Sequence, residues 1–262
     1  MRLRELTILQ YQNVTTNFQL HGLWLSLDAF RKQMEYLKAN NFKVLSIDDA
    51  ISFMERKKET NNRRPVALTF DNGFMAFYKE VYPVLAEYRY PATVLISPDR
   101  VDTATTIGGK SVSYLSWQIL RELVDSNITI GTYEDKELNI NKILPSIVKE
   151  HIVDYKKKME DKLGETVKYH GVKEGVPPSD IRSLIESTGF RAFLTQCPTN
   201  RKTDLFSIGR IQIDDEDFNI FLTKISNVYL FFKDRRSWKY IRKYHLDKLA
   251  HRVSEACNRL RG

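Results

Sequence analysis

The chain has 262 residues, of which 42% are hydrophobic, 11% aromatic and 28% charged. This composition, with only 8 Pro and 11 Gly, excludes collagen-like, low-complexity and disordered proteins and is typical of a globular chain. The two cysteines, Cys197 and Cys257, lie far apart and in no C-x-x-C pair, so neither a disulfide framework nor a thiolate metal site is predicted.

The N-terminal stretch MRLRELTILQYQNV is too polar for a signal peptide, and the run VYLFF at 228–232 is too short to span a bilayer. We therefore expect a soluble, cytoplasmic protein. Association with the cell envelope stays open, because a route of export without a signal peptide leaves no trace in the sequence.

The net charge of +8 is concentrated at the C-terminus, since residues 233–262 hold ten Lys or Arg against three acids. Within this segment, apolar and half-apolar residues recur at three- and four-residue spacing: Trp238, Ile241, His245, Leu249, Val253, Ala256 and Leu260. The pattern predicts an amphipathic helix with a basic outer face. Either this helix packs on the body with a solvated cationic side, or it docks on an anionic membrane surface or another acidic partner. No nucleic acid partner is expected.

Strand-like and helix-like segments alternate from the N-terminus onward. ELTILQYQNV (5–14) predicts a first strand, and Ser26 is placed to cap a helix that ends near Asn40 and Asn41. FKVLS (42–46) predicts a strand and DDAISFMERKK (48–58) a helix, before a polar linker leads into the strand VALTFD (66–71). An aromatic-rich helical segment then follows Gly73 to about Tyr88.

The same rhythm continues through PATVLIS (91–97), a helix capped by Ser116, the strand ITIGT (128–132) and a Lys-rich helix from about Pro145 to Lys162. VKYHG (167–171), a helix over 180–188 capped by Ser179, and FRAFLT (190–195) complete the pattern. Seven strands with interleaved helices predict an α/β fold with a closed or nearly closed parallel barrel. Its chemistry is expected at the C-terminal strand ends.

One such strand end is VALTFDNGF (66–74), which delivers Asp71, Asn72 and Gly73 to the tip of a buried strand. A carboxylate there is placed to act as a base. The simpler interpretation is that Asp71 caps the following helix and that Asn-Gly closes a turn.

At this point the sequence resembles the polysaccharide deacetylases of the NodB-homology family (carbohydrate esterase family 4). TFDNG at 69–73 is similar to the family's TFDDG, and YQNV at 11–14 to its YH-x-V opening. LSLDAFRKQMEYLKANNFKVLSIDDAI, EVYPVLAEYRYPATVLIS and YLSWQILRELVDSNITIGT continue the similarity in order, so that it covers about residues 6–213. The resemblance implies a distorted (β/α)7 barrel over 1–232, with the C-terminal helix of 233–262 added to it.

The resemblance also implies metal-dependent removal of an acetyl group from a sugar polymer. In such a site a divalent metal such as zinc, held by one carboxylate and two imidazoles, polarises the acetyl carbonyl and activates a water, while a second carboxylate takes the proton. By position, Asp71 matches the base and Asn72 matches the metal-binding Asp.

Several of the implied residues are replaced in this chain. The H-[ST]-x-x-H pair that follows the fifth strand reads YEDKE, with Tyr133 and Glu137 in place of the two histidines. Gln12 replaces the histidine of the opening motif, and Lys173 stands where an aromatic-Pro-Tyr-Gly motif has its proline. Arg210 in GRIQI does resemble the arginine that begins the last barrel strand.

We therefore expect a catalytically degenerate deacetylase-like barrel that holds no metal and retains carbohydrate binding, with Asp71, Asn72, Tyr133, Glu137, Lys173 and Arg210 as site candidates. Glu137 and Asn72 could still hold a hard ion weakly through oxygen. The alternatives are an N- or O-deacetylase that uses Asp71 in a non-standard site, and a scaffold that docks through the basic helix. His170, at the end of a strand, is a further candidate base, although a lone core histidine is more often structural.

Overall fold

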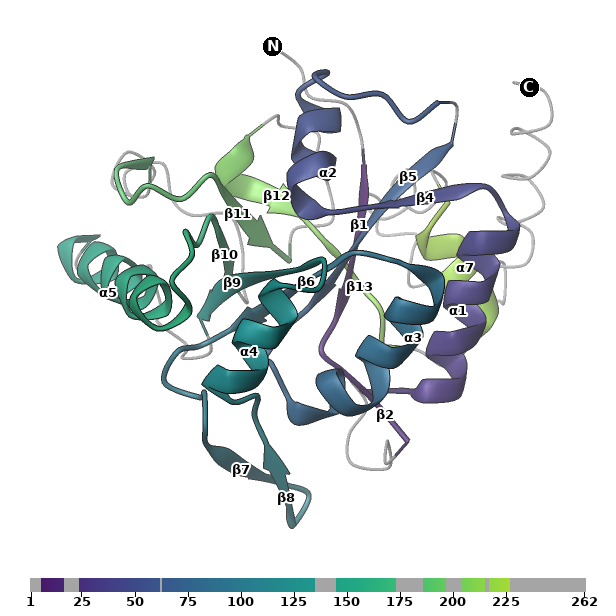
Figure 1. Ribbon diagram of the computed structural model, residues 1–262. Coiled ribbons are helices and arrows are strands. Elements are labelled where there is room, and N and C mark those ends of the chain that lie inside the picture. Colours follow the sequence, from purple (N-terminus) through teal and green to yellow (C-terminus); the bar gives the residue numbers. More distant parts are fainter. Residues whose placement is uncertain are drawn as a thin grey trace.

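The computed structural model describes residues 6–16, 24–61, 63–134, 145–172, 186–196, 204–214 and 217–226, and every structural statement below concerns these residues (Figure 1). The predicted helix of 180–188 lies mostly outside them, and that of 233–262 entirely outside. Within the described part, no helix has the length and the apolar composition needed to cross a bilayer.

The main sheet has nine strands in the order β12-β11-β10-β9-β6-β5-β1-β13, with β4 paired to β5 off this path. All of its neighbours are parallel. The strands are β1 (Thr7–Tyr11), β4 (Phe42–Leu45), β5 (Arg64–Phe70), β6 (Ala92–Ile96), β9 (Ile128–Glu134), β10 (Tyr169–Val172), β11 (Ala192–Thr195), β12 (Ile208–Gly209) and β13 (Ile211–Gln212).

The sheet closes on itself at Arg210. β12 and β13 stand at opposite ends of the strand order, yet only this residue separates them in the chain. The Arg210 amide donates to the carbonyl of Thr195 in β11 (2.9 Å), and the amide of Ile213 donates to that of Gln10 in β1 (2.8 Å). The last strand therefore joins the two edges and confirms the predicted barrel.

One predicted barrel strand lies off this ring. β4 pairs with the first half of β5, from Arg64 to Ala67, whereas β6 pairs with Thr69 and Phe70 in its second half. Because two strands share one edge of β5, the barrel is distorted there. The pair β12–β13 takes the remaining place in the ring.

Helices cover the outside of the ring (Figure 1). They are α1 (Leu27–Ala39), α2 (Ile47–Met54), a π-helical turn η2 (Phe77–Val81) leading into α3 (Tyr82–Tyr88), α4 (Trp117–Val124), α5 (Pro145–Leu163), a 3-10 turn η3 (Leu205–Ser207) and α7 (Phe218–Lys224). The predicted caps are confirmed, since Ser26 and Ser116 accept from the amides of Ala29 and Ile119.

Two predicted elements are corrected. The helix expected over 48–58 begins earlier, at Ile47, because Ser46 caps it, and it ends at Met54. The strand expected over 5–14 is two strands, β1 and β2 (Asn13–Thr15); the latter leaves the ring and pairs with β3 (Trp24–Ser26).

An antiparallel hairpin, β7 (Ala104–Ile107) and β8 (Lys110–Ser113), is an element that the sequence analysis missed. Its signal is the Gly108-Gly109 pair between two short strand-like runs, since both glycines have positive φ. The hairpin projects from the end of the barrel that also carries β2, opposite α2 (Figure 1).

The barrel interior is densely filled. Side chains alternate along each strand, so that Ile8, Ala67, Leu95 and other inward residues form one buried cluster with α2, which covers one end. A Cβ built on Gly131 or Gly171 would lie 2.6 Å from a methyl group of Leu95. These two glycines therefore make the room in which Leu95 packs.

Glycine is also required at the turn after β5. Gly73 has φ +66, and an added Cβ would lie 2.4 Å from Cδ1 of Ile96; Gly109 has φ +76 but nothing within 4 Å. We expect Gly109→Ala to cost about 1–2 kcal/mol for the left-handed backbone. Gly73→Ala should cost about 1–3 kcal/mol more, from overpacking against Ile96. Urea unfolding of both variants measures the difference, and equal losses would contradict the packing at this turn.

Candidate functional site

The C-terminal end of β5 is held in place by backbone hydrogen bonds on both sides of the turn. The Asp71 amide donates to the carbonyl of Tyr11 (2.9 Å), and the Gly73 carbonyl accepts from the amide of Leu115 (2.9 Å). Asn72 and Gly73 both have positive φ, 69° and 66°, which reverses the chain directly after the strand. Asp71 continues the inward face that Ala67 and Thr69 begin.

Asp71 forms a bidentate ion pair with Arg210 inside the barrel. Nη1 of Arg210 lies 2.5 Å from Oδ1 and Nη2 lies 3.1 Å from Oδ2. Gln10 in β1 donates from Nε2 to the same Oδ2 (2.6 Å), and Nη1 of Arg210 also reaches Oγ1 of Thr69 (3.3 Å). Each of these side chains is at most 2% exposed.

This arrangement bears on whether the carboxylate could act as a base. A general base must reach the proton that it abstracts, directly or through one water. Both oxygens of Asp71 already accept charge-assisted or amide hydrogen bonds, and the residue is 2% exposed. In this geometry both oxygens of Asp71 are engaged by partners inside the barrel.

Two atoms of the network have no hydrogen-bond partner among the described residues, Oε1 of Gln10 and Nε of Arg210. Both are buried, and an unsatisfied buried group costs about 1–3 kcal/mol. The network therefore keeps one further acceptor and one further donor inside the barrel.

Tyr133 lies in β9 on the inward face and is 2% exposed. It belongs to the same buried cluster as Leu95 and Tyr169. Its Cδ2 atom is 2.9 Å from the point where a Cβ of Gly171 would stand, so its ring covers that glycine. The position that corresponds to the first imidazole ligand is thus filled by a packed aromatic ring.

The remaining candidates are Asn72, Glu137 and Lys173. Asn72 is half-buried at the turn. Glu137 and Lys173 lie outside the described residues. Of the six predicted site residues, the structure brings Asp71 and Arg210 into contact, and it packs Tyr133 into the buried cluster with Leu95.

The described donors do not fit the metal that the resemblance implies. An amide at Asn72 and a buried phenol at Tyr133 are poor ligands for zinc, which favours imidazole and thiolate. Asp71 is occupied by a guanidinium. No group of three or more His, Cys, Asp or Glu side chains in the described part of the chain is arranged to hold a metal ion.

Sequence reasoning missed Gln10 and Thr69 as members of this site. Alternation along the strand is the signal that could have found them. Gln10 lies two residues after Ile8 and Thr69 two residues after Ala67, so each polar residue shares the inward face of its strand with a buried apolar one. A buried polar side chain at such a position needs a partner.

Comparison with known proteins fits this geometry. Residues 58–193, more than half of the chain, match the polysaccharide deacetylase family. The chain belongs to this family. It is 22% identical over 211 residues to the putative polysaccharide deacetylase YxkH of Bacillus subtilis, a match that covers 80% of this chain and 71% of that protein. Over 107 residues it is 30% identical to the poly-beta-1,6-N-acetyl-D-glucosamine N-deacetylase of Escherichia coli K12, across 38% of this chain but only 16% of that enzyme.

Solved structures of deacetylases share the fold. IcaB from Ammonifex degensii superposes with a TM-score of 0.68 at 19% identity, covering 79% of this chain and 91% of that chain. The polysaccharide deacetylase BC0361 from Bacillus cereus gives a TM-score of 0.67 at 19% identity, covering 85% and 69%. The nearly closed barrel of parallel strands is therefore the NodB-type fold.

His170 is a core residue of this fold. It is 1% exposed in β10 on the face opposite to Tyr169 and Gly171, and its ring lies 4.8 Å from that of Phe193. Nδ1 pairs with Oγ1 of Thr132 (2.8 Å). Burial, with a smaller contribution from the nearby His151, lowers the pKa of His170 from 6.5 to about 3. The side chain is therefore neutral and structural.

The lowered pKa of His170 predicts a pH dependence of stability. Only the unfolded chain binds this proton between pH 6.5 and about 3, so the free energy of unfolding should fall as the pH falls through this window. The slope contributed by His170 is at most about 1.4 kcal/mol per pH unit. In urea unfolding from pH 7.5 to 4.5, His170→Leu should flatten the dependence, whereas the control Phe30→Leu, in a buried ring that packs on Tyr11 and Phe70, should lower stability at every pH equally. Parallel curves for His170→Leu and wild type would contradict the assignment.

The Asp71–Arg210 pair should carry a large share of stability. Arg210→Leu leaves a carboxylate buried without its charge partner, which is expected to cost about 3–5 kcal/mol. The double variant Asp71→Leu/Arg210→Leu should recover part of this loss, because it removes both charges. As a control, Arg31→Ala breaks the exposed Arg31–Glu87 pair and should change stability by less than about 1 kcal/mol. Equal losses for Arg210→Leu and Arg31→Ala in urea unfolding would refute the argument.

Proposed function

We propose that this polysaccharide deacetylase family member binds an acetylated polysaccharide at the C-terminal strand ends of its barrel and has lost metal-dependent deacetylation. The observation that carries the proposal is the state of Asp71, whose two oxygens are held by Arg210 and Gln10 inside the barrel. Family membership supplies the polymer as the class of ligand.

Hydrolysis of an acetyl group needs two things at one place, a polarised carbonyl and an activated water. A metal would supply both when bound, but the donors at the corresponding positions are an amide and a packed phenol ring. The carboxylate that would take the proton is 2% exposed. These three features all act against the hydrolysis step. We therefore infer that this chain binds the polymer without hydrolysing it.

The ligand is inferred from the relatives. Several are named for poly-beta-1,6-N-acetyl-D-glucosamine, including those of Escherichia coli and Staphylococcus aureus. An acetamide group has one donor and one acceptor, which complement an amide side chain. Asn72, half-buried at the strand end, offers such an amide.

A second candidate is a deacetylase that works with a non-standard site. The observation in its favour is that Asp71 keeps a carboxylate at the strand end that parallel barrels use for chemistry. It requires the Arg210 guanidinium to yield one of the two oxygens when a substrate binds.

The test is calorimetric titration with acetylated β-1,6-linked glucosamine oligomers and with their de-N-acetylated forms. We expect binding of the acetylated oligomers only, no release of acetate with or without added zinc, and no stoichiometric metal in the native protein. Asn72→Gly keeps the left-handed backbone and removes the amide, so affinity should fall about tenfold, the value of one hydrogen bond. The matched control is Asn127→Gly, an exposed left-handed Asn at the start of β9, which should bind as wild type does.

The outcomes separate the candidates. Acetate release that Asp71→Asn abolishes in the folded protein would establish the enzyme and overturn the loss of chemistry. Equal affinity for acetylated and de-acetylated oligomers, or none for either, would overturn the binding proposal.

A further inference from the structure

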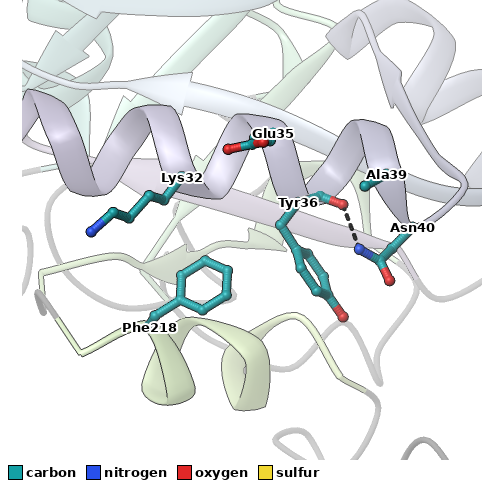
Figure 2. Close-up of a pocket in the computed structure, with 6 residues that line it drawn as sticks. All are labelled: Lys32, Glu35, Tyr36, Ala39, Asn40 and Phe218. Carbon is teal, nitrogen blue, oxygen red and sulfur yellow. Dashed lines mark hydrogen bonds between the residues drawn. The ribbon is translucent and has the colours of Figure 1, made fainter.

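A groove lies on the outer surface between α1 and α7, away from the strand ends (Figure 2). Its volume is about 330 Å³, and it is lined by Lys32, Glu35, Tyr36, Ala39, Asn40 and Phe218. The rings of Tyr36 and Phe218 lie between the two helices (Figure 2).

Two of the lining residues, Tyr36 and Phe218, are aromatic and only half-buried. The rings of Tyr36 and Phe218 meet edge to face with centroids 5.6 Å apart, and Phe218 stacks on Phe221 beneath it, also at 5.6 Å. Phe221 is fully buried, whereas Tyr36 and Phe218 stay partly open to solvent. These rings therefore extend from the buried core to the surface of the protein.

The chain itself supplies a segment of the right length and origin. The last described residue is Ser226, directly after α7, and residues 227–262 follow it. α7 has seven residues, so Phe218 lies only about 12 Å from the start of that segment at 1.5 Å per residue. The eleven residues between Ser226 and Trp238 reach up to about 35 Å when extended, enough to turn back onto the groove.

The sequence of this segment matches an aromatic groove. Its apolar residues follow one helical stripe that begins with Trp238 and Ile241 and continues to Leu260, and its Lys and Arg residues lie between them. A helix of this kind gains most of its stability from packing its apolar face on a partner surface. α1, with 13 residues, offers a helix about 20 Å long to pack against.

We propose that the C-terminal segment of this chain docks as a helix into the α1–α7 groove, with its apolar stripe on Tyr36, Ala39 and Phe218. Docked in this way, the segment covers the half-buried rings of Tyr36 and Phe218 and turns its basic face outward. The groove is then an intramolecular interface, and the positive charge of residues 233–262 becomes a fixed feature of the surface near α1.

Hydrogen–deuterium exchange of the full chain, read by mass spectrometry, tests this docking. Amides of residues 238–260 should exchange at least about tenfold more slowly than an unstructured peptide. Ala39→Arg places a long cation in the groove and should remove that protection. The matched control is Ala86→Arg, the same substitution at an exposed position of α3 outside the groove, which should leave it unchanged.

A second pair of variants changes the C-terminal segment and leaves the sequence of α1 and α7 as it is. Ile241→Arg, within the apolar stripe, should release the segment and raise exchange in α1 and α7, whereas Ser254→Arg, outside the stripe, should not. In every variant, unchanged exchange in β1 and β5 shows that the barrel is intact.

Three results would overturn the proposal. The first is fast exchange of residues 238–260 in the wild type. The second is protection that survives both Ala39→Arg and Ile241→Arg. The third is protection that disappears on dilution, which would assign the groove to a second copy of the chain.

Discussion

The bidentate contact between Asp71 and Arg210 is the interaction on which the closed barrel depends. Arg210 is the single residue between β12 and β13, the two strands that end the sheet order, so its backbone forms the seam of the ring. Its side chain crosses the interior to the end of β5, on the far side of β1 and β13. One residue therefore joins the edges through its backbone and ties them to a central strand through its side chain. A buried charge pair is costly to form. It fixes the geometry nevertheless, because separating the two side chains would leave each charge buried without a partner.

The same contact engages both carboxylate oxygens of Asp71 at the end of β5. A carboxylate at the C-terminal tip of a barrel strand is in the usual place for chemistry. Here the guanidinium and the amide of Gln10 each donate to the carboxylate, so that both of its oxygens accept a hydrogen bond. Leu95 and Tyr133 fill the space beside Gly131 and Gly171. In this structure Asp71 takes part in closing the barrel, and the interior around it is densely packed.

Much of the fold could be predicted from sequence because local signals and the ring agree. The serine caps of α1 and α4 and the apolar runs of the strands act within a few residues. The errors lie where pairing is decided at a distance. Nothing local to FKVLS indicates that β4 shares one edge of β5 with β6, and nothing local to Gln12 indicates that β2 leaves the ring to pair with β3.

Site residues could be predicted where a sequence motif marks them. They could not be predicted where their role depends on which side chains they contact in the fold. Asp71 and Arg210 were recognisable by motif, and their contact follows from the closure of the ring. Gln10 was not recognisable in this way, because its role depends on the inward parity of β1 and on a carboxylate sixty-one residues away. Tyr133 illustrates the reverse case: the motif marks it as a substituted ligand, while the glycine opposite it explains why a ring fits there. The residue at a position that a motif marks as a ligand is thus also constrained by packing, because its side chain lies in a densely filled interior.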